Sequence, residues 1–333
     1  MTAFFPPLLR EHLRTHPLIL VDIGARWGLQ SNWSPVRENL RLIVLEADPA
    51  EHARLAQAHR GDNVLFINAA AYSRATQLPL NIGRAGGTSS IFEPNHAFLA
   101  RFPDPGRYDV VERVEVRADS IDHLLRAHGV KDVDFIKIDT QGAETPILDG
   151  AAQMLRECVI GVEVEVIFAP LYVGQSEFGE IDARLRQAGF QLFDLRPSYW
   201  KRTAGARYGG PKGQLVFADA LYLVTEDAFQ RRLDAIEDSV ARSSKLLRAL
   251  AVCLLYGYAD FAIELLEPNR GLLDREAAEK VASQLRSEIP LSARLPHFRG
   301  RGWLSHFFYR LHRALFPTVG GWASGGRNIG NLD

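Results

Sequence analysis

The feature of this sequence that most limits its fold is a series of short, continuous apolar runs separated by helical segments. The first two runs are PLILVDIG (17–24) and RLIVLEADP (41–49), and further runs begin near positions 63, 134, 158, 190 and 214. Parallel strands that are buried on both faces have this composition. Helices between nearly all of the runs favour a doubly wound, mainly parallel α/β sheet over the first two thirds of the chain.

A change of pattern at Glu226 indicates a second part. The chain has 333 residues, which is more than one typical domain needs. No strand pattern follows Glu226, and residues 243–269 resemble one helical-hairpin unit of a tetratricopeptide array, with the two helices joined near Gly257. A single unit cannot bury its own apolar face, so we expect it to pack on the main domain or on a second subunit. We therefore expect a main domain over 1–225 and a helical extension over 226–333.

Charge and cysteine content exclude several classes of protein. The formal net charge of -1 provides no field that would attract nucleic acid, so we expect no nucleic-acid partner. Cys158 and Cys253 lie in apolar segments and predict buried, reduced thiols rather than disulfides or a zinc cluster. Charged residues interrupt the N-terminal segment where a signal peptide would be apolar, and no apolar run is long enough to span a bilayer. We expect a cytoplasmic protein.

The ends of the first two predicted strands have the pattern of a nucleotide site. Gly24 and Gly28 let the backbone approach a ligand, and we expect a following helix to present its N-terminus there. Glu46, at the tip of the second strand, is placed to accept both hydroxyls of an adenosine ribose. Arg26 and Leu29 occupy positions where a dinucleotide-binding loop needs glycine, so the pyrophosphate pattern is not met. The role of Glu46 suits NAD and S-adenosylmethionine equally.

Five stretches together resemble the FkbM family of S-adenosylmethionine-dependent methyltransferases: VDIGARWG, VLEADP, NAAAYS, DFIKIDTQGAE and GVEVEVIFAPLY. The resemblance extends over about residues 18–225. It implies a class I (Rossmann-like) methyltransferase fold, with a seven-stranded, mainly parallel sheet, an antiparallel last strand and helices on both faces. It also implies methylation of a hydroxyl oxygen on a sugar, glycan or secondary-metabolite acceptor. The family commonly has Glu at the position of Gln141, so a role that needs a charge there is in doubt.

The resemblance also implies a set of residues that bind S-adenosylmethionine. This cofactor has no phosphate, so its site needs acids and backbone amides rather than the full set of phosphate-binding glycines. By position, Asp22, Gly24 and Gly28 would lie along its methionine end. Glu46 would hold its ribose, and Asn68 and Ala69 would lie beside its adenine.

Two further segments are candidates for covering this site. Residues 75–117 hold Gly, Pro and short alternating stretches, which predict an insertion with hairpin character that would act as a lid. Within it, GGTSS (86–90) is either part of that cover or a plain turn. Arg26 is equally consistent with a surface residue and with a ligand contact.

Methyl transfer is an in-line displacement, so the enzyme must align the acceptor oxygen and remove its proton. Asp139, at the end of the fourth predicted strand, is the best-placed base or contact for the cofactor's ammonium. Glu163 and Glu165 share one face of the next strand and are further catalytic candidates. Sharing of a divalent metal by these acids has less support, and we expect no metal. His96 and His123 are weaker candidates.

Two other classes of function remain open. An NAD-dependent sugar-modifying oxidoreductase would need the full dinucleotide set of glycines, which is absent. A non-catalytic scaffold would keep the cofactor fold and bind a partner through the C-terminal helices.

The C-terminal tail has a pattern of its own. In GRGWLSHFFYRLHRALFP, apolar residues recur at helical spacing, and five arginines and one acid follow Pro296. We expect a basic amphipathic helix that contacts a membrane surface or an anionic carrier of the acceptor. Docking on the protein's own core or on a dimer partner is the alternative.

Overall fold

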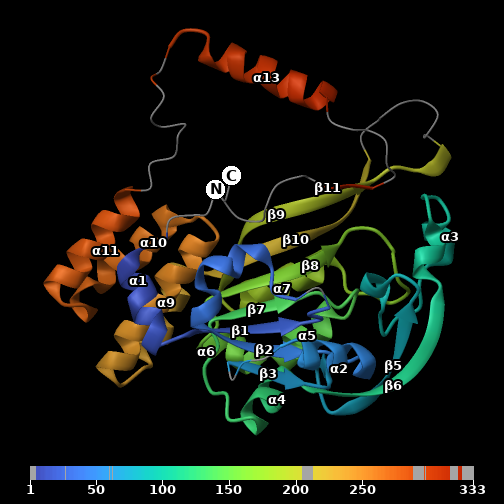
Figure 1. Cartoon of the computed structure of the whole chain (residues 1–333), viewed down its shortest axis with the longest axis horizontal. Helices are drawn as coiled ribbons and strands as arrows, with labels where there is room; N and C mark the ends of the chain where they lie inside the picture. The colour runs from blue at the N-terminus through green and yellow to red at the C-terminus, as the bar shows by residue number, and fades with distance from the viewer. Residues whose placement is uncertain are drawn as a thin grey trace.

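A computed structural model of the chain describes residues 5–26, 28–59, 61, 63–204, 213–287, 296, 298–315 and 322–324. Its centre is a sheet with the strand order β11-β9-β10-β8-β7-β1-β2-β3 (Figure 1). The strands are, in chain order, β1 (Leu18–Ile23), β2 (Leu40–Leu45), β3 (Val64–Ile67), β7 (Phe135–Ile138), β8 (Gly161–Ile167), β9 (Phe190–Trp200), β10 (Gln214–Val224) and β11 (Trp322–Ser324).

The pairing of these strands confirms the predicted class I methyltransferase arrangement. From β3 to β8 every neighbouring pair is parallel. The last of the seven predicted strands, β10, is antiparallel to both β8 and β9. Because the chain moves outward from β1 to β3 and then returns to the other side of β1 with β7, the order reverses at β1. Ligands of open α/β sheets bind at such a reversal, outside the carboxyl ends of the strands.

The prediction that no strand follows Glu226 is wrong. Strand β11 pairs antiparallel with the edge strand β9, with Trp322 opposite Trp200. A strand of three residues is too short to show a period in the sequence. Its pairing depends instead on the backbone groups that the edge strand β9 offers, which no local sequence pattern reveals.

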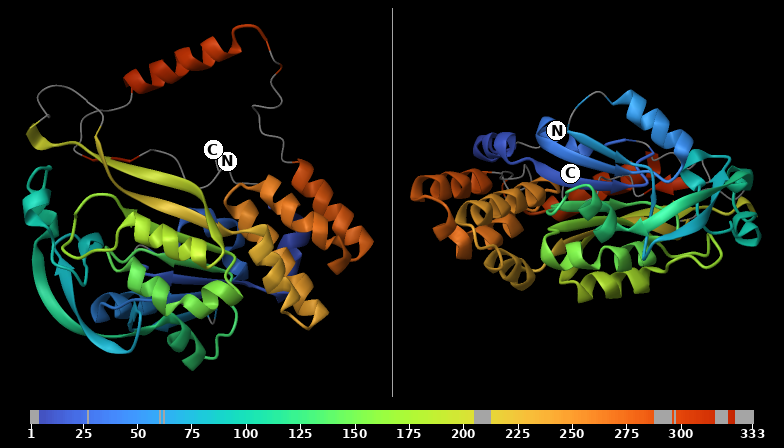
Figure 2. Two further views of the ribbon diagram at one scale, coloured as in Figure 1. Left: turned by 180° about the vertical axis from the view of Figure 1, so that it is seen from behind. Right: turned by 90° about the horizontal axis from the view of Figure 1, so that it is seen from below.

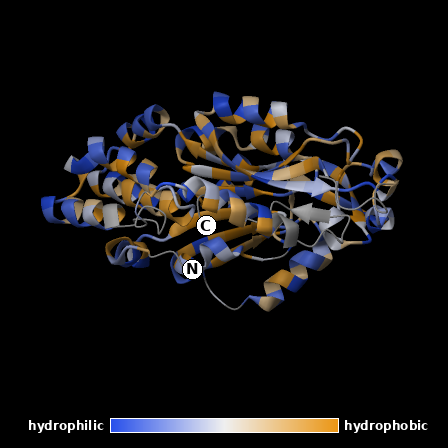
Figure 3. Ribbon diagram, turned by 90° about the horizontal axis from the view of Figure 1, so that it is seen from above, coloured by the Kyte–Doolittle hydropathy of each residue, from blue (hydrophilic) through white to orange (hydrophobic). Residues whose placement is uncertain are grey.

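Helices cover both faces of the sheet, as predicted. Figures 1 and 2 show α1 (Pro7–Thr15), the 3₁₀-helix η1 (Ser31–Asn39) and α2 (Pro49–Ala58) on one face, and α4 (Ile121–Ala127), α5 (Glu144–Gly150), α6 (Ala152–Glu157) and α7 (Phe178–Gln187) on the other. Apolar residues of the strands lie between these layers (Figure 3), and every residue of β8 is buried. Local signals explain the helix starts: Asp48 caps α2 and Ser120 caps α4 through their side-chain oxygens.

A second, smaller sheet lies beside the carboxyl ends of the central strands (Figure 1). It has the order β4-β6-β5 and is built from β4 (Ala70–Tyr72), β5 (Thr76–Gly83) and β6 (Val110–Ser120). Strands β5 and β6 form an antiparallel pair, which confirms the predicted hairpin character of the insertion. The segment between them contains η2 (Gly86–Thr88), α3 (His96–Leu99) and η3 (Pro105–Tyr108).

The C-terminal helices pack at the opposite end of the molecule from this small sheet (Figure 1). They are α8 (Glu226–Asp234), α9 (Ser239–Leu255), α10 (Ala259–Leu266), η5 (Glu267–Leu272) and α11 (Arg275–Ser287). Helices α9 and α10 form the predicted hairpin, with Gly257 at a φ of 80° between them. The second half of α9 is buried throughout and contacts α1 and η1, so the hairpin packs on the main domain.

A buried cluster of charges joins α9 to the start of β7. Lys245 Nζ lies 2.7 Å from Asp132 Oδ1 and 2.9 Å from Asp134 Oδ1, and Arg248 contacts the same two carboxylates at 2.5 and 2.9 Å. Asp134 is fully buried and also accepts a hydrogen bond from the backbone N–H of Ile19. Each buried charge therefore has an opposite charge beside it, which is the condition under which burial of charges is tolerated.

Both cysteines are buried free thiols, as predicted. Among the residues that the structure describes, none of the helices combines the length and the apolarity that a transmembrane span requires.

We predict that Asp134→Asn lowers the free energy of unfolding by about 3 kcal/mol, because it leaves Lys245 and Arg248 buried with one carboxylate fewer. Asp149→Asn is the matched control: its partner Arg184 is 2.8 Å away, but the pair is exposed and contributes at most about 1 kcal/mol. Denaturant unfolding of both variants measures the difference. Equal losses would show that the cluster does not hold the extension in place.

Candidate active site

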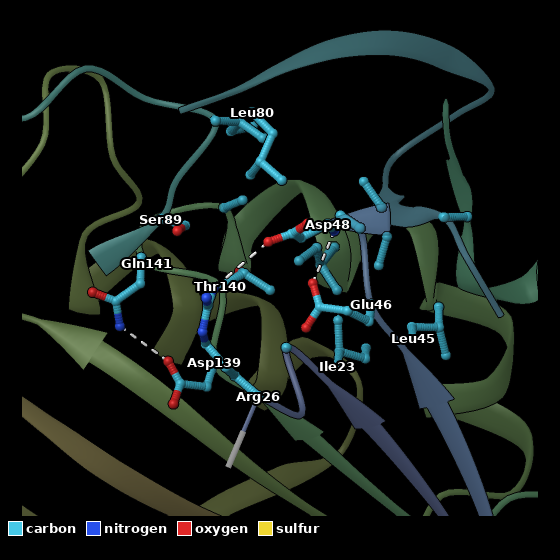
Figure 4. A pocket seen from close by; sticks show the side chains of 18 of the residues that line it. Ile23, Arg26, Leu45, Glu46, Asp48, Leu80, Ser89, Asp139, Thr140 and Gln141 are labelled. Carbon is cyan, nitrogen blue, oxygen red and sulfur yellow. Dashed lines mark hydrogen bonds and ion pairs between the residues drawn. The ribbon is translucent and has the colours of Figure 1, made fainter. Parts of the chain in front are cut away.

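A pocket opens at the reversal point of the sheet, beside the ends of β1, β2 and β7 (Figure 4). Its wall is formed by the ends of β1 and β2, the start of β4 with the preceding Ala69, Leu80 of β5, the GGTSS segment with Ile91, the loop after β7 and Ile147 of α5. The lining residues are Ile23, Gly24, Arg26, Leu45, Glu46, Ala47, Asp48, Ala69, Ala70, Ala71, Leu80, Gly86, Gly87, Ser89, Ile91, Asp139, Thr140, Gln141, Ala143 and Ile147. Predicted site residues Gly24, Glu46, Ala69 and Asp139 are thus brought together.

Gly24 brings the ends of β1 and β7 into contact. Its φ is 79°, and a Cβ at this position would lie 2.0 Å from the backbone oxygen of Asp139. Only glycine satisfies both the left-handed conformation and the close approach. Gly28 has a similar φ of 77°, but a Cβ there would meet nothing within 4 Å, and Gly28 does not belong to the described lining.

The segment after Gly28 does not form the α-helix that the sequence predicts. The chain forms the 3₁₀-helix η1, which contains Pro35 and whose N-terminal residue Gln30 provides no side-chain cap. A proline removes one backbone donor, and a 3₁₀-helix has poorer hydrogen-bond geometry than an α-helix. In residues 28–40, therefore, no regular α-helix N-terminus is present to bind a phosphate.

Glu46 presents a buried carboxylate to the pocket. Its Oε1 accepts a hydrogen bond from the backbone N–H of Asp48 at 2.9 Å. Burial raises the pKa of Glu46 to about 7, against the smaller effect of that hydrogen bond. Asn68 donates its side-chain amide to the backbone oxygen of Glu46 at 2.9 Å, so Asn68 holds the strand end while Ala69 lines the pocket.

Arg26 and the GGTSS segment close the pocket together. The guanidinium of Arg26 lies 3.8 Å from Asp48 Oδ2 (Figure 4) and rests against Gly86, where a Cβ would be 2.3 Å from its Nε. Ser90 Oγ donates a hydrogen bond to the backbone oxygen of Gln141 at 2.7 Å. The segment is therefore tied to both sides of the pocket, and Gly86, Gly87 and Ser89 line it.

Gln141 links two carboxylates at the inner end of the pocket. Its amide nitrogen donates to Asp139 Oδ1 at 3.0 Å and to Glu165 Oε2 at 2.7 Å, and its oxygen accepts from the hydroxyl of Tyr172 at 3.0 Å. Burial and the nearby charge of Asp139 raise the pKa of Glu165 well above its usual range. Sequence reasoning missed this function of Gln141 and Tyr172; the one signal was that Gln stands where the resemblance suggests Glu.

A second row of charges lies one step deeper in the sheet. Lys137 stands between Asp22 and Glu163 in the strand register, and its Nζ lies 3.5 Å from Asp22 Oδ1. Glu163 accepts hydrogen bonds at 2.9 Å from the amide of Gln30 and from the hydroxyl of Tyr256, and burial raises its pKa. These groups lie beneath the wall of the described pocket and do not line it.

The remaining candidates are placed as follows. Glu165 contacts the lining residue Gln141 without lining the pocket itself, and neither His96 nor His123 belongs to the lining of the described pocket. Within the described part of the chain, no three His, Cys, Asp or Glu side chains are grouped in a way that would hold a metal ion.

Comparison with protein families gives the context of this site. The sequence profile described as "Methyltransferase FkbM domain" matches residues 22–192, just over half of the chain. The chain belongs to the FkbM methyltransferase family. The resemblance seen in the sequence motifs is thereby confirmed. The range of this FkbM protein that matches the profile begins in β1 and ends in β9. The helices from α8 onward lie outside it.

Solved structures give more distant likenesses. The methyltransferase FkbM from Methylobacillus flagellatus KT is 14% identical, with a TM-score of 0.36 over 62% of this chain and 43% of that one. This FkbM protein thus spans less than half the length of that chain. Precorrin-6y C5,15-methyltransferase from Geobacter metallireducens GS-15 is 13% identical, with a TM-score of 0.34 over 66% of this chain and 86% of that one. A search of curated protein sequences finds no match.

We predict that Gly24→Ala destabilises the protein more than Gly28→Ala. Both substitutions place Cβ in the left-handed region at a cost of about 1–2 kcal/mol, but only the first forces a side chain into the backbone of Asp139, at a further cost of about 1–3 kcal/mol. The free energies of unfolding from denaturant titrations give the comparison. If the two variants are equally stable, the contact between β1 and β7 is not as close as described.

Proposed function

We propose that this FkbM-family protein uses S-adenosylmethionine to methylate a hydroxyl oxygen of a sugar, glycan or secondary-metabolite acceptor. The observation that carries the proposal is that Gly24, Glu46 and Asp139 line one pocket at the reversal point of the sheet. The two buried free thiols fit a protein of a reducing compartment, and we propose the cytoplasm.

The described residues fit S-adenosylmethionine better than a dinucleotide. Glu46 faces the pocket with Oε1 held by the N–H of Asp48, which fixes the carboxylate for ribose hydroxyls. The small apolar side chains of Ala69, Ala70 and Ala71 line the pocket where adenine would lie, and the Gly24 turn and Asp139 would border the methionine end. A pyrophosphate would need an α-helix N-terminus after β1, where η1 stands instead.

The cofactor supplies a methyl group on a positively charged sulfur, and the protein must receive the proton of the acceptor hydroxyl. Asp139 is the candidate, because its side chain is about one third exposed towards the pocket, whereas Glu165 is buried. Burial and the nearby charge of Asp139 raise the pKa of Glu165, which favours the protonated form of Glu165. Gln141 holds both carboxyl groups through one amide and sets the orientation of Asp139.

The competing functions are less well supported. The sequence contains one Tyr-x-x-x-Lys spacing, Tyr208 to Lys212, in residues outside the described part of the chain. The full dinucleotide set of glycines that an NAD-dependent oxidoreductase would also need is absent from the sequence. A non-catalytic scaffold would not require Glu46 and Asp139 to line the same pocket.

We predict that S-adenosylhomocysteine binds with an affinity that depends on the charge of Glu46. Ribose hydroxyls donate to a carboxylate, so the ligand prefers the ionised form. Because the pKa of Glu46 is about 7, a change from pH 8 to pH 6 protonates it and weakens the affinity by about tenfold. Glu46→Gln should bind more weakly at pH 8 and lose this pH dependence.

Calorimetric titration of the full chain with S-adenosylhomocysteine and with NAD tests the assignment. Glu112→Gln, an exposed substitution on β6 outside the described lining, is the matched control and should behave as the wild type. An affinity that is unchanged in Glu46→Gln would refute the ribose assignment, and tighter binding of NAD would refute the cofactor.

We predict that Asp139→Asn keeps the fold but lowers methyl transfer at least about 100-fold, the usual minimum for loss of a general base. The assay uses methyl-labelled S-adenosylmethionine with a panel of glycosides and other polyhydroxylated acceptors, and each rate is divided by the folded fraction. Cofactor affinity is measured in parallel, since a role in holding the ammonium of the cofactor would weaken binding as well as turnover.

Two results would remove Asp139 from the role of base. A lower melting temperature with unchanged turnover per folded molecule would make it a structural acid. Loss of wild-type activity in a chelator, with recovery in Mg²⁺, would assign it to a shared metal site instead.

A further inference from the structure

Helix α13 (Arg301–Leu315) gathers its large apolar side chains on one face. With 100° between successive residues, the five large apolar side chains that are described fall within an arc of about 140°. They are Trp303, Leu304, Phe307, Phe308 and Leu311. Among residues 301–312 the other positions lie outside this arc: they are Gly302, the aromatic Tyr309 and polar residues such as Arg301, Ser305, His306 and Arg310.

The apolar face of α13 is exposed. Trp303 has 71% of its surface exposed and Phe308 57%, and the other three residues of the face are exposed as well. Figure 1 shows α13 standing apart from the sheet and its helices, so the main domain does not cover the face. Proteins seldom leave so large a continuous aromatic surface in water, which indicates a partner.

The charge around α13 is of one sign. Between Ile289 and Leu332 the sequence holds six arginines and no Asp, Glu or Lys, although the whole chain has a net charge of -1. Arg301 and Arg310 border the apolar arc on its two sides in the helical projection. A second copy of this chain, with no acid in the same segment, would bring like charges together along such a face. An anionic surface would complement it.

The length of α13 agrees with a helix that lies on a bilayer. Fifteen residues span about 22 Å, which is short of the roughly 20 residues that are needed to cross the hydrocarbon core. An aromatic face of this kind inserts at the boundary of headgroups and acyl chains, while flanking arginines reach lipid phosphates.

We propose that α13 is a peripheral membrane-binding helix that attaches the protein to bilayers containing anionic lipids. The apolar face enters the lipid boundary, and the arginines select for negatively charged headgroups. The methyltransferase domain is thereby held at a membrane surface. This inference does not depend on the identity of the cofactor or of the acceptor.

The test is flotation of the full chain with vesicles of phosphatidylcholine alone and with vesicles in which about 30% of the lipid is phosphatidylglycerol, whose negative surface potential attracts basic side chains. We expect at least tenfold more protein to float with the anionic vesicles, and less as salt is raised. The double variant Phe307→Ser, Phe308→Ser should lose this binding at least tenfold. Arg301→Glu with Arg310→Glu should lose the preference for anionic vesicles.

The matched control is Val111→Ser with Val240→Ser, which removes two exposed apolar side chains on β6 and α9 and should float as the wild type does. Equal melting temperatures of all variants exclude unfolding as the cause. The proposal is overturned if the intact protein does not float with anionic vesicles, or if the phenylalanine variant still does. It is also overturned if the wild type is a dimer that the phenylalanine substitutions dissociate and that binds no vesicles.

Discussion

The close packing of Gly24 against the backbone of Asp139 is the constraint on which the pocket depends. The end of β1 is bonded on both sides: the N–H of Gly24 donates to the backbone oxygen of Leu45, and the N–H of Asp139 donates to that of Ile23. Because a side chain at position 24 would separate β1 from β7, glycine there keeps the two strand ends together. Glu46 and Asp139 therefore face one cavity from the two sides of the reversal point.

A layer of buried charges supports this pocket from below and connects it to the C-terminal helices. Lys137 lies among Asp22, Asp139 and Glu163, whose charges raise its pKa despite burial. Glu163 is in turn bonded by Tyr256, the residue that ends α9. The rings of Trp33 and Phe135 pack around Tyr256 and exclude water from this bond. The helical extension is thus part of the support of the sheet and not an independent appendage.

The sequence predicted the strands and their ends well, because the signals there are local. A buried strand that ends in an acid is visible in VLEADP, and the last residue of this stretch, Pro49, suits the first turn of α2. The same local logic failed at η1, where Pro35 and a 3₁₀-helix replace the expected α-helix. Strand β11 could not be predicted, because it pairs with the edge strand β9, which is far away in the sequence. No local period in the sequence reveals such a pairing.

The roles of individual side chains were harder to predict than the position of the site. The alternation in GVEVEV correctly predicted that Glu163 and Glu165 share one face of the strand. It did not reveal that the two side chains lie at different depths below the pocket. Glu163 accepts hydrogen bonds from Gln30 and Tyr256 beneath the pocket wall. Glu165 accepts one from Gln141, beside Asp139. These partners lie directly before η1, directly after α9 and in the loop after β7, and contacts between such distant segments become visible only in the folded chain.

The most direct test of this account is a crystal structure of the full chain with S-adenosylhomocysteine. The ligand should lie in the pocket at the end of β1, with its ribose hydroxyls within hydrogen-bond distance of Glu46 and its sulfur on the side of Asp139. A ligand bound elsewhere, or a ribose directed away from Glu46, would contradict it.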